Sequence, residues 1–209
     1  MFKRIVLVLS TFFLAFSILS ISVLRSAAVP CVFSVSPSPT PGTIQGQGDK
    51  IDYELAYPGG ILPDHPLWFL KALRDRLWYL STFNSSRKAE LLLLFADKRL
   101  ASSEILFARN KPEIAFSTLS KAEKYLEQAQ KIEEENRKKG LKTDDFLLKL
   151  ANASLKHREE IEKIIVIAPD DAKPEIIKLE DYAINTYKQS RDALNSLGIP
   201  APKSPFLGD

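Results

Sequence analysis

The chain has 209 residues, enough for one domain and a targeting segment, and 45% of them are hydrophobic, an ordinary share for a protein with a buried core. The formal charge of +3 comes from Lys3, Arg4 and Arg25, the only charged residues before Val29; without them, 26 basic residues balance 26 acidic ones. A body without net charge lacks the concentrated basic surface of nucleic-acid-binding proteins, so we expect no nucleic-acid partner.

The first 28 residues have the three-part pattern of a secretory signal. A short basic start is followed by an uncharged apolar run, Ile5–Leu24, and then by small residues at Ser26–Ala28. The run is long enough to span a bilayer, so residues 1–28 are either a cleaved signal peptide, which we favour, or an uncleaved anchor. In both cases the positive-inside rule predicts that the rest of the chain is exported.

Residues 29–60 are rich in Pro, Ser, Gly and Thr, which predicts a flexible linker in front of a domain. The apolar end of this linker, Ile51–Tyr57, is a candidate for docking on the domain edge. The only cysteine, Cys31, excludes an internal disulfide, and we interpret it as incidental. The alternatives are intermolecular pairing and lipidation, but Pro30 stands where lipidation signals have a small residue.

Residues 61–198 show no strand-like alternation and few glycines, which predicts an all-α, up-and-down bundle of about five helices. Short connections should make successive helices antiparallel. The final residues, 199–209, contain three prolines and should be irregular. Prolines, glycines and capping residues, Thr143 among them, set the expected helix bounds at 65–80, 85–109, 112–139, 143–168 and 172–197.

The second expected helix is apolar on all sides, because Leu91–Phe95 are five consecutive apolar residues that point in five directions. A helix that is apolar all round must be buried all round. We therefore expect residues 85–109 to lie at the centre, flanked by the first and third helices and by part of the last two. The competing hypothesis leaves Leu91 or Leu94 exposed for a partner or a second copy of the chain.

Leucines and aromatic residues crowd the first expected helix and its exit. Its leucines at positions 67, 70, 73 and 77 share one stripe. Core packing is the simpler interpretation of the aromatic residues, and a membrane-interface or partner-binding belt is the alternative. The aromatic residues are Trp68, Phe69, Trp78, Tyr79 and Phe83. The candidate interaction residues are Trp68, Trp78, Leu91 and Leu94.

No motif indicates an active site, so we expect no catalytic residues, no metal and no cofactor. The chain has two histidines and one cysteine, too few for the usual zinc sites, and lacks phosphate-loop, HExxH and GxSxG patterns. We expect His65 to begin a helix and His157 to be packed or half-exposed beside an apolar stripe. Charged residues on the second helix, Glu90 and Arg99 among them, should form ion pairs with neighbouring helices.

Residues 60–126 contain four short motifs: Leu62-Pro63-Asp64 with Pro66, Phe69-Leu70-Lys71, Lys88-Ala89-Glu90, and Ala96 with Lys98-Arg99-Leu100. In these motifs the segment resembles a bacterial domain family of unknown function, DUF5667. Two positions depart from the family pattern: His65 replaces a small polar residue and Trp68 replaces a tyrosine. The resemblance implies an exported or membrane-tethered helical protein, with neither enzyme activity nor a cofactor.

Together these features favour a non-enzymatic helical module of the bacterial cell envelope that binds another protein or supports an assembly. The alternative is an extracytoplasmic sensor or ligand-binding bundle with a pocket between its helices. The expected partners are an envelope protein or a second copy of the chain, and the membrane through the N-terminal segment.

Overall fold

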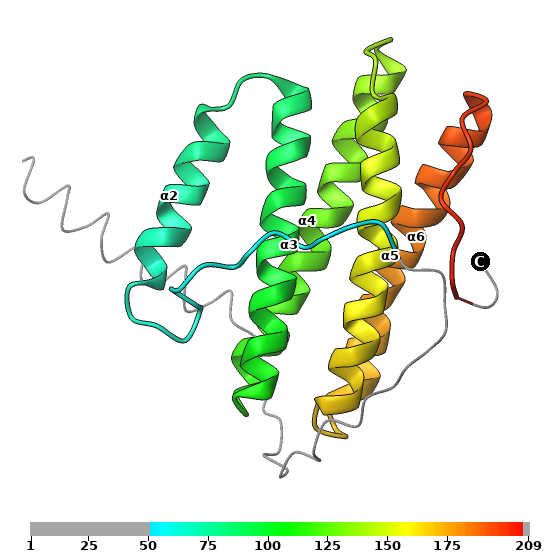
Figure 1. Ribbon diagram of the computed structural model, residues 1–209. Coiled ribbons are helices and arrows are strands. Elements are labelled where there is room, and N and C mark those ends of the chain that lie inside the picture. The colour runs from blue at the N-terminus through cyan, green and yellow to red at the C-terminus, as the bar shows by residue number, and fades with distance from the viewer. Residues whose placement is uncertain (1–50, 207–209) are drawn as a thin grey trace, which may run out of the picture. The chain divides into compact units, whose positions relative to one another are not determined.

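The structure, a computed structural model, describes residues 51–206. The predictions for the leader, for Cys31 and for residues 29–50 lie outside this range. Within it the chain forms five α-helices and no strand, which confirms the all-α class (Figure 1). No helix in the described range combines the length and hydropathy needed to cross a membrane. The helices are α2 (Trp68–Ser81), α3 (Ser85–Ala108), α4 (Pro112–Lys138), α5 (Asp144–Ile167) and α6 (Lys173–Ser196).

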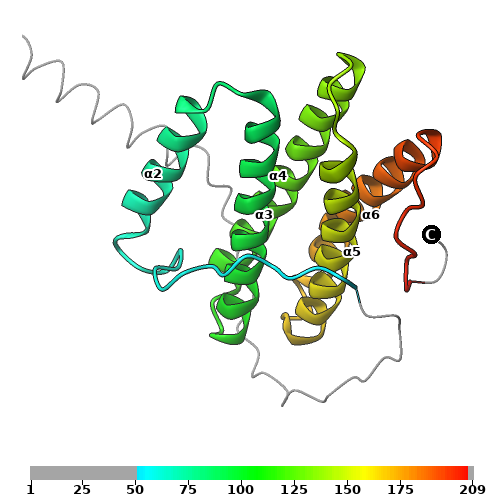
Figure 2. The ribbon, with the colours of Figure 1, turned by 45° about the horizontal axis from the view of Figure 1, so that its top comes forward.

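Helices α3 to α6 form a four-helix bundle. Its main contacts join α3 to α4 and α5 to α6, and further contacts join α4 to α6 and α3 to α5 (Figures 1 and 2). Although α4 and α5 are consecutive, they touch each other little and lie diagonally across the bundle. The expectation that successive helices pack side by side is therefore correct for two helical hairpins, α3–α4 and α5–α6. It is wrong for α4 and α5, which belong to different hairpins.

Helix α3 is buried on nearly every side, as its run of leucines predicts. Leu92 and Leu93 are 1% exposed, Leu91 and Phe95 are also buried, and Leu94 is half-buried. The helices that cover α3 are mainly α4 and α5. The expectation that the last helix also flanks α3 is wrong, because α6 packs on α4 and α5 instead. The backbone of α2 stands further from α3, and aromatic side chains fill the space between these two helices.

The ends of α3 and α4 show why these helices stop where the sequence predicts. Asn110 and Gly140 adopt the left-handed conformation, with φ of 58° and 78°. This conformation lets the next backbone N–H bond back to a carbonyl inside the helix. Thr143 precedes α5 as predicted but does not cap it, because its hydroxyl donates instead to Glu133 Oε1 at 2.8 Å.

Residues 51–60, which we call the strap, cross the outer side of α3 and α5 (Figure 1). Three of its side chains, Ile51, Tyr53 and Leu55, pack against three different clusters of the core. The predicted docking of this segment is confirmed. After α6 the chain is irregular, as predicted, yet it packs on the bundle, and Tyr187 Oη donates to the carbonyl of Pro202 at 2.8 Å.

Candidate functional site

One polar group of side chains lies inside the bundle, where four segments meet. We call Tyr53 of the strap, Asp97 of α3, Glu123 of α4 and His157 of α5 the buried polar cluster. His157 Nδ1 lies 2.8 Å from Glu123 Oε1, and His157 Nε2 lies 3.2 Å from Asp97 Oδ1. Tyr53 Oη donates to the other Asp97 oxygen, Oδ2, at 2.8 Å. The cluster thereby ties three helices to the strap.

The geometry of the buried polar cluster favours a protonated histidine. Both ring nitrogens of His157 face carboxylate oxygens, and only the imidazolium can donate a hydrogen bond from each nitrogen. Burial by itself would lower the pKa of His157, but Glu123 and Asp97 outweigh it and raise that pKa to about 9. Burial, with the adjacent Asp97 charge, also raises the pKa of Tyr53, so its hydroxyl keeps the proton that it donates.

We assign the buried polar cluster a structural role. His157 and Glu123 are 0% exposed, so a substrate cannot reach the imidazole without opening the bundle. Glu123 Oε2 is buried without a hydrogen-bond partner among the described residues. Within residues 51–206, no group of His, Cys, Asp and Glu side chains is arranged to hold a metal ion.

Sequence reasoning missed this cluster. The prediction that His157 is packed or half-exposed was right about packing but did not identify its partners, which lie 34 and 60 residues away. The one available signal was the placement of Glu123 next to Ala122, a residue on the apolar seam of α4. A carboxylate on the edge of such a seam needs a buried cation or donor.

Arg99 contradicts the predicted ion pair between helices. It is almost fully buried, and its guanidinium carbon lies 4.6 Å from the ring centre of Tyr125, 5.8 Å from that of Phe95 and 6.0 Å from that of Trp68. Aromatic faces therefore take the place of an acidic partner. Glu90, the other expected partner, pairs with Arg87 of its own helix at 2.9 Å.

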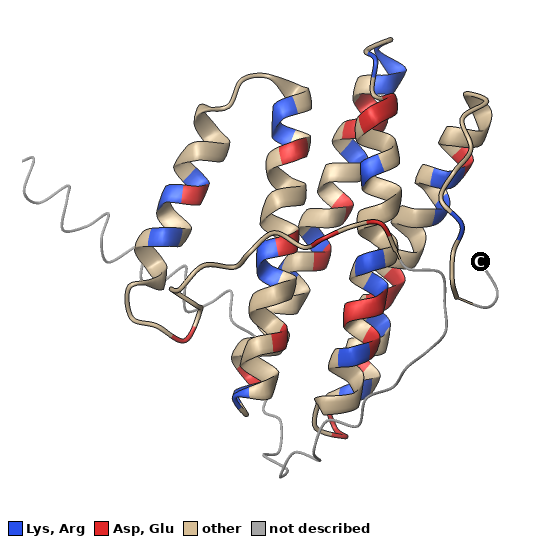
Figure 3. Cartoon of the chain, in the orientation of Figure 1, with Lys and Arg blue, Asp and Glu red and all other residues tan. Residues whose placement is uncertain are grey.

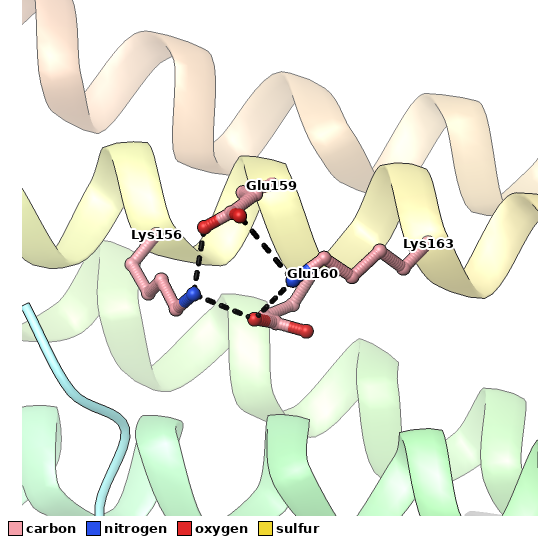
Figure 4. Close-up of polar contacts among 4 residues, drawn as sticks. All are labelled: Lys156, Glu159, Glu160 and Lys163. Carbon is pink, nitrogen blue, oxygen red and sulfur yellow. Dashed lines mark hydrogen bonds and ion pairs between the residues drawn. The ribbon is translucent and has the colours of Figure 1, made fainter. Parts of the chain in front are cut away.

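A second charged group, on α5, consists of two lysines and two glutamates of the same helix. Glu160 Oε1 lies 2.9 Å from Lys156 Nζ and 3.0 Å from Lys163 Nζ, and Glu159 bonds both lysines as well (Figure 4). Spacings of three and four residues are those of stabilising ion pairs along a helix. We assign this group a structural role.

A cavity of about 390 Å³ lies between the strap and α3. Four carboxylates and one cation, Lys149, contribute to its lining, and its apolar wall includes Leu94. The carboxylates of the lining are Asp52, Glu54, Glu90 and Asp97.

The largest departure from expectation is the outer face of α2. The leucine stripe of this helix points away from the bundle, and its members are at least 47% exposed. The side of α2 that faces the bundle carries Trp68, Asp75 and Tyr79 instead. We call the exposed set the outer face of α2: Phe69, Leu70, Leu73, Leu77 and Leu80.

The four candidate interaction residues occupy different environments. Trp68 is half-buried between Lys71 and Arg99. Trp78 is 49% exposed and meets Phe95 edge to face, with 6.3 Å between the ring centres. Leu91 belongs to the core, where a partner cannot reach it, and Leu94 lines the cavity under the strap.

The core interpretation of the aromatic residues is correct for only part of the group. Phe69 and Phe83 are exposed, Phe83 to 92%, while Trp68 and Tyr79 are half-buried. A period of three and four residues identified the stripe on α2, but such a pattern contains no information about whether the bundle covers it.

Comparison with known proteins gives one match. A family model described as a domain of unknown function, DUF5667, matches residues 60–171. The matched region is longer than the resemblance in residues 60–126 and extends through α5. No curated protein and no solved structure matches the chain.

Proposed function

Because this chain belongs to the DUF5667 family, whose function is unknown, we propose a function from its own geometry. We propose a non-enzymatic, exported helical module of the bacterial cell envelope that presents α2 to another envelope component. The outer face of α2 is the observation that carries this proposal. It is a contiguous set of exposed apolar side chains, and such patches on soluble proteins mark surfaces that bind something.

Two further features support the proposal. The N-terminal pattern of basic start, apolar run and small residues is typical of exported proteins. His157 and Glu123 are 0% exposed and bond within the buried polar cluster, so neither side chain is accessible as a general base.

The sensor or ligand-binding alternative draws on the cavity between the strap and α3. The support for this alternative is weaker, because the carboxylates of the cavity favour a positively charged ligand but do not indicate which one. The outer face of α2 has no role in that alternative.

Photo-cross-linking in cells tests the proposal. A photoreactive amino acid at Leu73 should give products with an envelope component, whereas one at Ile177 should not. Ile177 is a matched control, because both side chains are 51% exposed but Ile177 lies on α6. A C-terminal reporter that works only outside the cytoplasm tests export. Equal products from both positions, or a silent reporter with normal expression, would reject the proposal.

A further inference from the structure

We propose that the outer face of α2 binds the surface of a lipid bilayer that contains anionic phospholipids. In this arrangement the helix lies flat at the boundary between headgroups and acyl chains. This inference names the envelope component that α2 contacts. It rests on the proposed function, which places the chain beside a bilayer.

The dimensions and composition of α2 suit a membrane surface. The 14 residues of α2 rise about 21 Å, less than the roughly 30 Å hydrocarbon core, so the helix cannot span it. Leu70, Leu73, Leu77 and Leu80 form one apolar strip along the whole helix. Interfacial helices combine such a strip with aromatic residues, and the exposed Phe69, Trp78 and Phe83 supply them here.

The charges beside the strip favour an anionic surface. At 100° per residue, Arg74 falls on one edge of the strip and Arg76 on the other. Arg74 pairs with Asp75 at 2.7 Å, but Arg76 forms no ion pair with any residue of the described range. Arginines at these edges can extend toward lipid phosphates, which a guanidinium binds through two hydrogen bonds. Figure 3 shows the basic positions along α2.

A second copy of the chain fits this face less well. The spacing of the four leucines would suit a coiled coil, in which positions beside the apolar seam face each other. In an antiparallel pair Arg74 would face Arg74 and Arg76 would face Arg76, which brings like charges together. In a parallel pair Arg76 would face Ser81, so neither arginine would gain an acidic partner.

The bundle holds the outer face of α2 in position. Lys71 Nζ donates to the carbonyl oxygens of Pro58 and Ile61 at 2.5 and 3.0 Å. Asp64, just before the helix, lies 2.7 Å from Lys111 Nζ at the start of α4. These contacts fix the side of α2 that faces the bundle, so the apolar strip faces outward without any rearrangement.

An uncleaved N-terminal segment, the alternative to a signal peptide, would keep this face close to a membrane. If the apolar run Ile5–Leu24 lies in a bilayer, residues 25–50 connect it to the strap over at most about 90 Å. Tethering at this range raises the effective concentration of α2 at the surface, so even weak binding becomes populated.

Tryptophan fluorescence tests the inference in the full chain, reconstituted as one copy per lipid nanodisc. Both tryptophans lie in α2, so Trp68→Phe leaves Trp78 as the only reporter. With phosphatidylglycerol present, lipids brominated near the top of their acyl chains should quench most of the Trp78 emission. With phosphatidylcholine alone, or with Arg74→Gln and Arg76→Gln, we expect most of that quenching to be lost.

Matched variants separate binding by α2 from simple proximity to the bilayer. Leu73→Gln with Leu77→Gln should abolish quenching, whereas Ile177→Gln on α6 should leave it unchanged. All these side chains are exposed, so melting temperatures should not change. Equal quenching in the α2 variants would overturn the inference.

Two other outcomes would also overturn it. One is an unquenched Trp78 in these discs, together with rapid disulfide formation between copies of Leu73→Cys when several copies share a larger disc. That second measurement uses a chain with Cys31→Ser, and this result would assign the face to a second copy. The other is an unquenched Trp78 without such cross-linking, which would leave the face to a protein partner. The nanodisc measurement does not require export, so its result is independent of the reporter test of the proposed function.

Discussion

Raising the pH should destabilise this protein through a single side chain, His157. The pKa of His157 is about 9 in the folded protein, because Glu123 and Asp97 stabilise the imidazolium despite its burial. In the unfolded chain the ordinary value of 6.5 applies. A group whose pKa is raised by folding stabilises the protein fully below its unfolded pKa, and that stabilisation is lost as the pH rises through the folded pKa.

The size of this effect follows from the two pKa values. Their difference corresponds to about 3 kcal/mol, lost mainly between pH 6.5 and about 9. Urea unfolding of residues 49–209 at several pH values measures it directly. The free energy of unfolding should fall by about 1.4 kcal/mol per pH unit in this window, because the folded state retains one proton that the unfolded state releases.

A double variant provides the control for other groups that titrate in the same window. Asp97→Asn with Glu123→Gln keeps the size of both side chains but removes their charges, so the decrease with pH should nearly vanish. Tyr53→Phe removes only the hydrogen bond from the strap and should keep the decrease. A wild-type stability that is constant or rises between pH 6.5 and 9 would refute a charged His157, as would a His157 nuclear magnetic resonance signal that titrates below pH 6.5.

Two further predictions concern the helical body. A chain that begins at Asp49 should be soluble and give a strongly helical circular dichroism spectrum, and a sheet or coil spectrum would contradict the bundle. Leu93→Asp should unfold this body, because Leu93 is 1% exposed and the aspartate would be an unpaired charge in the core, whereas Leu94→Asp at a half-buried position should lower the melting temperature much less. Equal losses in thermal denaturation would show that position 94 tolerates a charge no better than the core does.

The sequence predicts the bounds of α3 to α6 well because their ends depend on local chemistry. The prediction that His65 begins the first helix is wrong: α2 begins at Trp68, because Pro66 disfavours a helical conformation at the residue before it. Pro112 begins α4 and Gly140 follows its end, and each acts through its own backbone preference. Glu127 and Lys131, four residues apart on α4, likewise form an ion pair at 2.7 Å. Such features require only residues within about one helical turn of each other.

Other features depend on contacts that local patterns do not contain. The leucine stripe on α2 is correctly predicted as a stripe, but its direction depends on how the strap and α3 hold the opposite side of the helix. The buried polar cluster joins residues from four segments, none of which has a motif of its own. Arg99 shows the same limit, because its aromatic surroundings come from three separate helices.

The pairing of α5 with α6 determines how short a foldable fragment of this protein can be. The family match ends at residue 171, just before α6, so a fragment cut there would keep α5 and lose its main neighbour. Leu147 and Leu155 of α5 would lose their contacts with Tyr187 and Leu194 and become exposed to water. The boundary defined by sequence similarity therefore falls inside the four-helix bundle rather than at its edge.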